Sequence, residues 1–196
     1  AQRPDASACA EPELWNQKMS RWVNRGAKGI ALLDDTGPRT KLRYVFDIAD
    51  THLVRGGKTP LLWNLDSHEH EQAILDHLAD TYGLSQTDSM NTALMELAQQ
   101  LTADNLDEAM DGLAYEVADT FLEELDEDNI RVRFRELMTN SIFYTLSRRC
   151  GQEPMDVLDD DDFIRIVDFN KLPVLSFLGN AVSEQCEAVL FDIGRE

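Results

Sequence analysis

The stretch from residue 15 to residue 33 gathers the side chains of this sequence that could bind a polyanion. It holds two tryptophans, four Lys or Arg residues and two glycines, in a chain of 196 residues whose formal net charge is −19. Cations attract phosphates, indole rings stack on bases, and glycines let a backbone turn and approach closely. The residues that could form such a surface, including one arginine further along the chain, are Trp15, Arg21, Trp22, Arg25, Lys28 and Arg43.

An amphipathic helix is the alternative interpretation of the same stretch. The apolar residues of 13–25 are spaced as on one face of a helix, and Gly26 is placed where such a helix would end. Large apolar residues at that spacing usually face a core, so core packing is the favoured interpretation for Trp15 and Trp22 taken alone. The cations would then be solvated or paired with Glu11 and Glu13.

Charge is distributed unevenly along the chain. Residues 1–58 hold 10 Lys or Arg against 7 Asp or Glu, a net of +3, whereas residues 59–130 hold 18 acids and no Lys or Arg. Residues 131–196 hold 8 Lys or Arg against 12 acids, a net of −4. The acidic block repels a phosphate backbone, so any contact with nucleic acid should be confined to the N-terminal part.

The amino-acid composition narrows the classes of protein to which this chain could belong. Hydrophobic residues make up 43% of the chain, as in ordinary globular proteins, and no apolar run approaches the ~20 residues that span a bilayer. The three cysteines are far apart and form no Cys-x-x-Cys pair, which excludes a disulfide framework and favours free thiols in a reducing cytoplasm. The sequence opens without methionine, and we expect a segment cut from a longer, cytoplasmic protein.

The periodicity of the sequence changes near Pro60. Before it, residues 30–33 and 42–48 are predicted to pair as a β-hairpin after the N-terminal helix. The second strand alternates between a face that we expect to be buried, with Leu42, Tyr44, Phe46 and Ile48, and an open face with Arg43, Val45 and Asp47.

After Pro60 only helical spacing recurs. Helices are predicted from Ser67 to a stop at Gly83, over apolar stripes at 90–101, 106–121 and 130–146, from Asp159 onward, and over 175–193. The predicted fold class is α+β, with a small helix-plus-hairpin unit at 1–62 and an acidic helical unit at 63–196.

Part of the N-terminal unit resembles a known family. The run from Val23 to Ala31, with a basic pair around Gly26, followed by the strand Leu42–Ile48, is similar to the N-terminal domain of ArdC-type antirestriction proteins. Ala27 stands where that family commonly has an acid. The resemblance implies single-stranded-DNA binding, and it implies the assignment of Arg25, Lys28 and Arg43 to the DNA-binding site.

The whole chain also looks like a stretch of the large multidomain proteins of bacterial integrative conjugative elements. Those proteins carry helicase and DNA methylase modules elsewhere, which implies other domains of a larger polypeptide as partners. The metallopeptidase half of the ArdC family is not recognisable, because His70 and Glu71 are not followed by the second histidine of His-Glu-x-x-His.

The spacing of the residues excludes a nucleotide-binding loop and argues against a histidine metal site. Gly56-Gly57-Lys58-Thr59 lacks the first glycine of a nucleotide-triphosphate loop, since His52 stands in its place and Pro60 follows. His70 and His77 would lie about 10.5 Å apart along a helix at ~1.5 Å per residue, and His68 and His70 point to different faces. We therefore expect neither an enzyme nor a cofactor or metal in this segment.

The sequence and the resemblance together predict a non-catalytic module of a mobile-element (conjugative transposon) protein that binds single-stranded DNA through Arg21, Trp22, Arg25, Lys28 and Arg43. Two alternatives stay open. The acidic helices could dock a basic partner, for example by mimicking DNA, or the segment could be a structural linker between catalytic modules. The run Arg131, Arg133 and Arg135 is expected to pair with the acids of 123–128.

Overall fold

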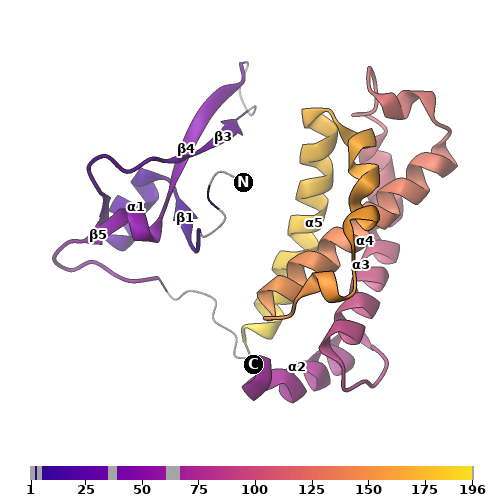
Figure 1. Ribbon diagram of the computed structural model, residues 1–196, viewed down its shortest axis with the longest axis horizontal. Coiled ribbons are helices and arrows are strands. Elements are labelled where there is room, and N and C mark those ends of the chain that lie inside the picture. The colour runs from indigo at the N-terminus through magenta and orange to yellow at the C-terminus, as the bar shows by residue number, and fades with distance from the viewer. Residues whose placement is uncertain (1–2, 4–5, 35–38, 61–66, 196) are drawn as a thin grey trace. The chain divides into compact units, whose positions relative to one another are not determined.

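The chain folds into two compact units, residues 1–64 and 65–196, each described here by itself (Figure 1). The structure is a computed structural model that describes residues 3, 6–34, 39–60 and 67–195, and for residues 67–69 the backbone alone. The fold class is α+β, as predicted: a short helix with small antiparallel sheets precedes a mainly helical part.

The first unit contains two small sheets. Its elements are β1 (Cys9–Ala10), α1 (Pro12–Met19), β2 (Arg21–Val23), β3 (Ile30–Asp34), β4 (Lys41–Asp47), the 3₁₀ helix η1 (Ile48–Asp50) and β5 (Thr51–Leu53). One sheet has the order β1-β4-β3, and the other pairs β2 with β5, antiparallel throughout. The predicted hairpin of β3 and β4 is confirmed, with Ile30 opposite Val45 and Asp34 opposite Lys41.

The N-terminal helix is shorter than predicted. It ends at Met19 because Ser20 adopts the left-handed conformation (φ 49°), and the chain then enters β2. Backbone bonds to a distant segment fix this switch: Val54 N–H donates to Ser20 O and Lys58 N–H donates to Met19 O. Gly26 does have a positive φ of 85°, but it lies in a turn after β2 instead of ending a helix.

The expected burial of one face of β4 is wrong for its first half. Leu42 and Tyr44 are 55% and 48% exposed, Ile48 lies outside the strand in η1, and Asp47 on the supposedly open face is buried. The core of this unit gathers at the other end of the strand, where β1 pairs with Phe46 and Asp47. In the described residues β1 pairs with β4 only at Phe46 and Asp47, so the half of the hairpin that carries Leu42 and Tyr44 is two-stranded.

The second unit is helical. Its elements are α2 (Ser67–Tyr82), α3 (Met90–Leu113), η2 (Phe121–Glu124), α4 (Glu127–Arg149), η3 (Pro154–Asp156), η4 (Asp160–Phe169) and α5 (Leu172–Ile193). The helix ending at Gly83 (φ 68°), the helix over 130–146 and the last helix are confirmed. The stripes at 90–101 and 106–121 are not two helices, because α3 runs unbroken to Leu113.

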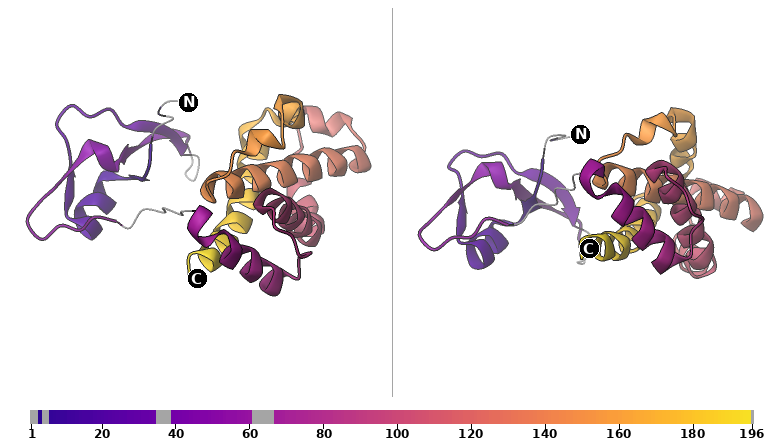
Figure 2. Two further views of the ribbon diagram at one scale, coloured as in Figure 1. Left: turned by 60° about the horizontal axis from the view of Figure 1, so that its bottom comes forward. Right: turned by 90° about the horizontal axis from the view of Figure 1, so that it is seen from below.

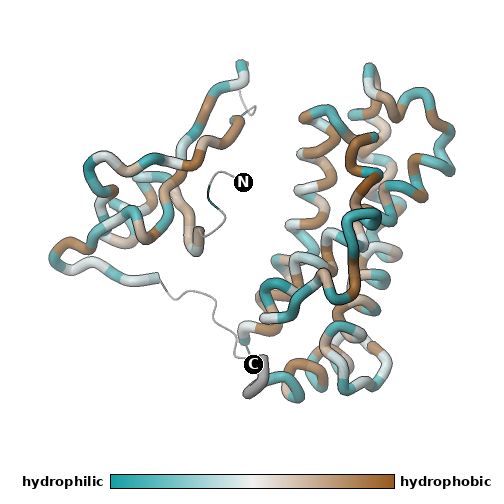
Figure 3. Tube along the Cα trace, viewed as in Figure 1, coloured by the Kyte–Doolittle hydropathy of each residue, from teal (hydrophilic) through white to brown (hydrophobic). Residues whose placement is uncertain are grey.

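The core of the helical unit lies where α4 packs against α3 and α5 (Figure 2). Phe134 of α4 is fully buried, with its ring centroid 6.2 Å from that of Phe169 and 6.1 Å from that of Phe177. Along each helix hydrophobic residues alternate with hydrophilic ones (Figure 3), as expected of helices that bury one face and solvate the other. Among the described residues, none of these helices is both apolar enough and long enough to cross a bilayer.

Candidate nucleic-acid interface

Trp22 is exposed on the two-stranded ribbon of β2 and β5. It lies directly opposite His52 in the antiparallel register, and 54% of its surface is accessible. Directly opposed residues of antiparallel strands lie on the same face, so the indole and the imidazole share one side of the ribbon. His52 Nδ1 lies 2.8 Å from Asn24 Oδ1, which holds the imidazole on that side. The prediction that both tryptophans pack into a core is therefore wrong for Trp22.

Trp15 has the buried position that its helical spacing predicted. It is 2% exposed, and its indole N–H donates to Phe46 O at 2.8 Å, which fastens α1 to β4. This ring is inaccessible to a ligand, so it drops out of the candidate surface.

Arg25 and Lys28 lie just after β2, around a tight turn. Ala27 N–H donates to Asn24 O at 3.0 Å, which places Arg25 and Gly26 at the two central positions. Both cations are exposed, and within the described part of the chain neither forms an ion pair. The prediction that Gly26 and Gly29 serve the backbone is confirmed, because a Cβ on Gly29 would lie 3.0 Å from the ring of Phe46.

Arg21 and Arg43 are already engaged in the fold. Arg21 lies on the opposite face of β2 from Trp22, and its Nε–H donates to Thr51 Oγ1 at 2.7 Å. Arg43 belongs to the other sheet and forms an ion pair with Glu11 at 3.2 Å, with 53% of its side chain exposed. An exposed pair contributes only ~0–1 kcal/mol, so a phosphate could replace Glu11 at Arg43. Trp22, Arg25 and Lys28 are thus all exposed within seven residues of the chain, whereas Arg21 bonds to Thr51 and Arg43 pairs with Glu11 on another sheet.

Three residues beside this surface were missed from the sequence. His52 is the cross-strand neighbour of Trp22, while Arg55 lies within a second turn after β5 and Lys58 follows that turn, both exposed. A sequence repeat could have identified Arg55 and Lys58, because the pattern Arg25-Gly26-Ala27-Lys28 occurs again as Arg55-Gly56-Gly57-Lys58. The spacing of that second segment excludes a nucleotide-binding loop, and the sequence prediction gave its cations no other role.

A buried carboxylate fixes the N-terminal segment to the sheet that carries Arg43. Asp47 is 2% exposed, and its oxygens accept from Ser7 N–H at 2.6 Å, Ala8 N–H at 3.0 Å and Ala49 N–H at 2.9 Å. Burial by itself raises the pKa of this carboxyl, but these backbone donors and the charge of Arg3 outweigh burial and hold the pKa below its usual value. The charged form of Asp47 is therefore a structural anchor.

Two of the three arginines predicted to pair with the acids of 123–128 pair with other acids, and Arg135 forms no ion pair with a described residue. Arg131 pairs with Asp107 of α3, Arg133 with Asp168 of η4, and the acids of 123–128 are not their partners. The tertiary fold explains this difference in partners, because α4 packs against α3 and η4, which bring Asp107 and Asp168 to its arginines. Between described residues, Asp107–Arg131 is the one ion pair that neutralises an acid of residues 70–130.

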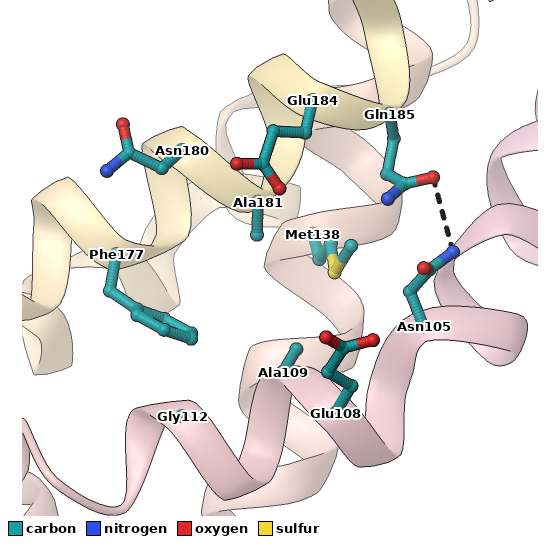
Figure 4. Close-up of a pocket in the computed structure, with 10 residues that line it drawn as sticks. All are labelled: Asn105, Glu108, Ala109, Gly112, Met138, Phe177, Asn180, Ala181, Glu184 and Gln185. Atoms are coloured by element: carbon teal, nitrogen blue, oxygen red, sulfur yellow. Dashed lines mark hydrogen bonds between the residues drawn. The ribbon is translucent and has the colours of Figure 1, made fainter. Parts of the chain in front are cut away.

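The helical unit has an open cavity of ≈ 500 Å³ between α3, α4 and α5 (Figure 4). Glu108 and Glu184 stand at its rim, Asn105 Nδ2 donates to Gln185 Oε1 at 3.2 Å, and the ring of Phe177 forms part of its wall. Two carboxylates disfavour a phosphate here, so this cavity does not serve the proposed ligand.

Burial raises the pKa of the Cys150 and Cys186 thiols to about 11, and with Cys9 they form no disulfide.

No match was found when the chain was compared with protein-family models, with curated proteins or with solved structures. The resemblance to ArdC-type N-terminal domains therefore stays a prediction. In the described ranges no three His, Cys, Asp or Glu side chains come together as metal ligands, and the side chain of His68 lies outside those ranges.

Proposed function

We propose that this chain is a non-catalytic module that binds single-stranded DNA through its N-terminal unit, within a protein of a conjugative mobile element. The observation that supports this most directly is the exposed indole of Trp22, followed within six residues by exposed Arg25 and Lys28, which have no acidic partner among the described residues. An exposed aromatic ring next to unneutralised cations can stack a base and hold its phosphates. The mobile-element context rests on the sequence resemblance alone.

The charge distribution favours a single strand bound locally over a duplex bound broadly. Residues 1–58 carry a net charge of +3, and the rest of the chain is strongly acidic. A duplex presents one charge per ≈ 1.7 Å of helix axis, twice that of one strand, so the acidic helices would oppose it more. Stacking on Trp22 also requires an unpaired base.

The direct test is fluorescence anisotropy of labelled dT12 and of a 12-base-pair duplex, with the complete chain, at 50 mM and 200 mM salt. We expect dT12 to bind more tightly than the duplex and to lose affinity as the salt rises, because bound counterions are released. Absence of dT12 binding at 50 mM salt by a folded sample would remove the proposal.

Two variants refine this test. Changing Arg25, Lys28 and Arg43 together to Ala should strongly weaken binding while the melting temperature hardly moves, since exposed charges contribute little to folding. Trp22→Ala should weaken binding by about 5- to 150-fold, the equivalent of ~1–3 kcal/mol for one stacked base. Tyr115→Ala is the matched control, because Tyr115 is an 85% exposed aromatic residue of the helical unit.

A second candidate function is the docking of a basic protein partner by the helical unit. It is favoured because most acidic side chains of this unit have no cation of the described residues to neutralise them: among the acids of 70–130, Asp107 alone pairs with a described cation. A pull-down that recovers a DNA-binding protein, and that is unaffected by the triple change, would support this function over the first.

A further inference from the structure

The β2–β5 ribbon has an internal repeat that relates its two ends. Residues 51–58 repeat the pattern of residues 21–28, with Arg, Gly and Lys at matching positions. The two strands are antiparallel and centred on the Trp22–His52 pair, with Arg21 opposite Leu53 and Val23 opposite Thr51. The repeat is therefore arranged about a local two-fold axis through the central pair.

The backbone hydrogen bonds obey the same symmetry. At one end Asn24 N–H donates to Asp50 O at 2.8 Å, and at the other Val54 N–H donates to Ser20 O at 3.2 Å. The turn at 24–27 closes with a bond of 3.0 Å and the turn at 54–57 with a bond of 2.8 Å. Gly26 and Gly56 have φ values of 85° and 82°. The two turns thus share one backbone geometry.

The glycines are required by this geometry, but the cations are not. The φ values above 80° strongly favour glycine at positions 26 and 56. Gly57 is also required, because a Cβ there would lie 2.7 Å from Ser20 O, whereas Ala27 fits at the matching position. Nothing in either turn calls for the arginine at its second position or for the lysine that follows it. The recurrence of Arg and Lys therefore needs an explanation outside the fold.

The two faces of the ribbon differ in what they offer. On one face Arg21 and Thr51 bond to each other across the strands. On the other, Trp22 and His52 are exposed side by side. At the two ends Arg25, Lys28, Arg55 and Lys58 are exposed, and in the described ranges none of them forms an ion pair.

We propose that the two turns and the central Trp22–His52 pair form one composite site, along which a single-stranded nucleic acid lies from turn to turn. Phosphates contact Arg25 and Lys28 at one end and Arg55 and Lys58 at the other, with bases over Trp22 and His52. Each arginine is three residues from the centre, so the two ends are at most about 20 Å apart at ~3.3 Å per extended residue. That span matches about six stacked nucleotides at ~3.4 Å each, within the usual site size of small single-strand binders. The inference rests on the proposed function and extends it to a second, equivalent turn.

The test compares three double variants of equal charge change in the complete chain, with dT12 as the probe. These are Arg25→Gln with Lys28→Gln, Arg55→Gln with Lys58→Gln, and Lys18→Gln with Arg39→Gln as the control. Lys18 and Arg39 are also exposed cations of the same unit, and neither forms an ion pair with a described residue. Anisotropy titrations from 50 to 200 mM salt give the affinity and its salt dependence for each protein, and thermal melts verify folding.

Each turn variant should lower the slope of log affinity against log salt by about 1.4, since each single-strand phosphate contact contributes ~0.7. That change corresponds to a loss of about 25-fold in affinity at 0.1 M salt. The control should lose far less. If the second turn variant behaves as the control while the first loses affinity, the composite site is wrong and the proposed function stands. If all three variants lose affinity equally, the surface attracts DNA without a defined site, which also overturns the inference. If the unmodified chain does not bind dT12, both proposals fail.

Discussion

Replacing Asp47 with Asn should destabilise the N-terminal unit selectively. The carboxylate accepts Ser7 and Ala8 N–H groups at one oxygen and Ala49 N–H at the other. An asparagine has one acceptor oxygen, so its amide nitrogen would face at least one of these N–H donors. An unpaired buried donor costs about 1–3 kcal/mol, and the remaining bonds lose the gain from a charged acceptor. The expected loss is therefore about 2–4 kcal/mol.

Denaturant unfolding followed by two probes separates the units. Tryptophan fluorescence reports the buried Trp15 of the first unit, and circular dichroism at 222 nm reports mainly the helices of the second. Asp47→Asn should shift the fluorescence transition and leave the helical transition unchanged. Glu13→Gln, at an exposed acid of α1, is the control and should shift neither. Equal fluorescence midpoints for Asp47→Asn and the unmodified chain would refute the anchoring role of Asp47.

The stability difference between Asp47→Asn and the unmodified chain should depend on pH. Because the pKa of Asp47 is lowered in the fold, the folded state takes up this proton at a lower pH than the unfolded state does. The stabilisation is then complete above the unfolded value of about 3.9 and is lost as the pH falls through the lowered folded value. The stability gap between the two proteins should stay constant from pH 7 to pH 5 and narrow below about pH 4. A gap that does not depend on pH would contradict this assignment.

Two further changes test the helical unit. Gly112→Ala places a Cβ 2.6 Å from the ring of Phe177, and we expect the free energy of unfolding to fall by about 1–2 kcal/mol because of overpacking. At Gly179 a Cβ meets nothing within 4 Å, so Gly179→Ala should instead stabilise α5 by about 0.4–1 kcal/mol in the same thermal melts. Tyr82→Phe removes the 2.9 Å hydrogen bond to Asp192 and should cost about 1 kcal/mol, while Tyr144→Phe serves as the control. The pKa of Tyr82 is raised to about 12 by burial and by Asp192, so its stabilisation should hold below about pH 10 and disappear as the pH rises towards 12.

The sequence predicted the long helices because their apolar stripes and stop signals are local. Gly83 and the stripe of α4 needed no distant contact to be interpreted correctly. The predicted break near residues 102–105 was wrong because no breaker stands there, and α3 carries its stripe through the junction from Leu101 to Leu106.

The ribbon could not be predicted in the same way. Helical spacing continues through Trp22, but backbone bonds from Val54 and Lys58 end the helix at Met19. β5 has only three residues, and its partner strand is far away in the sequence. The cations of the candidate site were identified from residue type, whereas the exposure of Trp22 and its pairing with His52 followed only from the register.

A two-dimensional ¹H–¹⁵N NMR titration of the complete chain with dT12 tests most directly where a single strand binds. We expect the backbone amides of residues 21–28 and 51–58 to shift together as dT12 is added at low salt, while the amides of the helices α3, α4 and α5 stay in place. Shifts confined to those helices, or the absence of any shift at saturating dT12, would contradict the account.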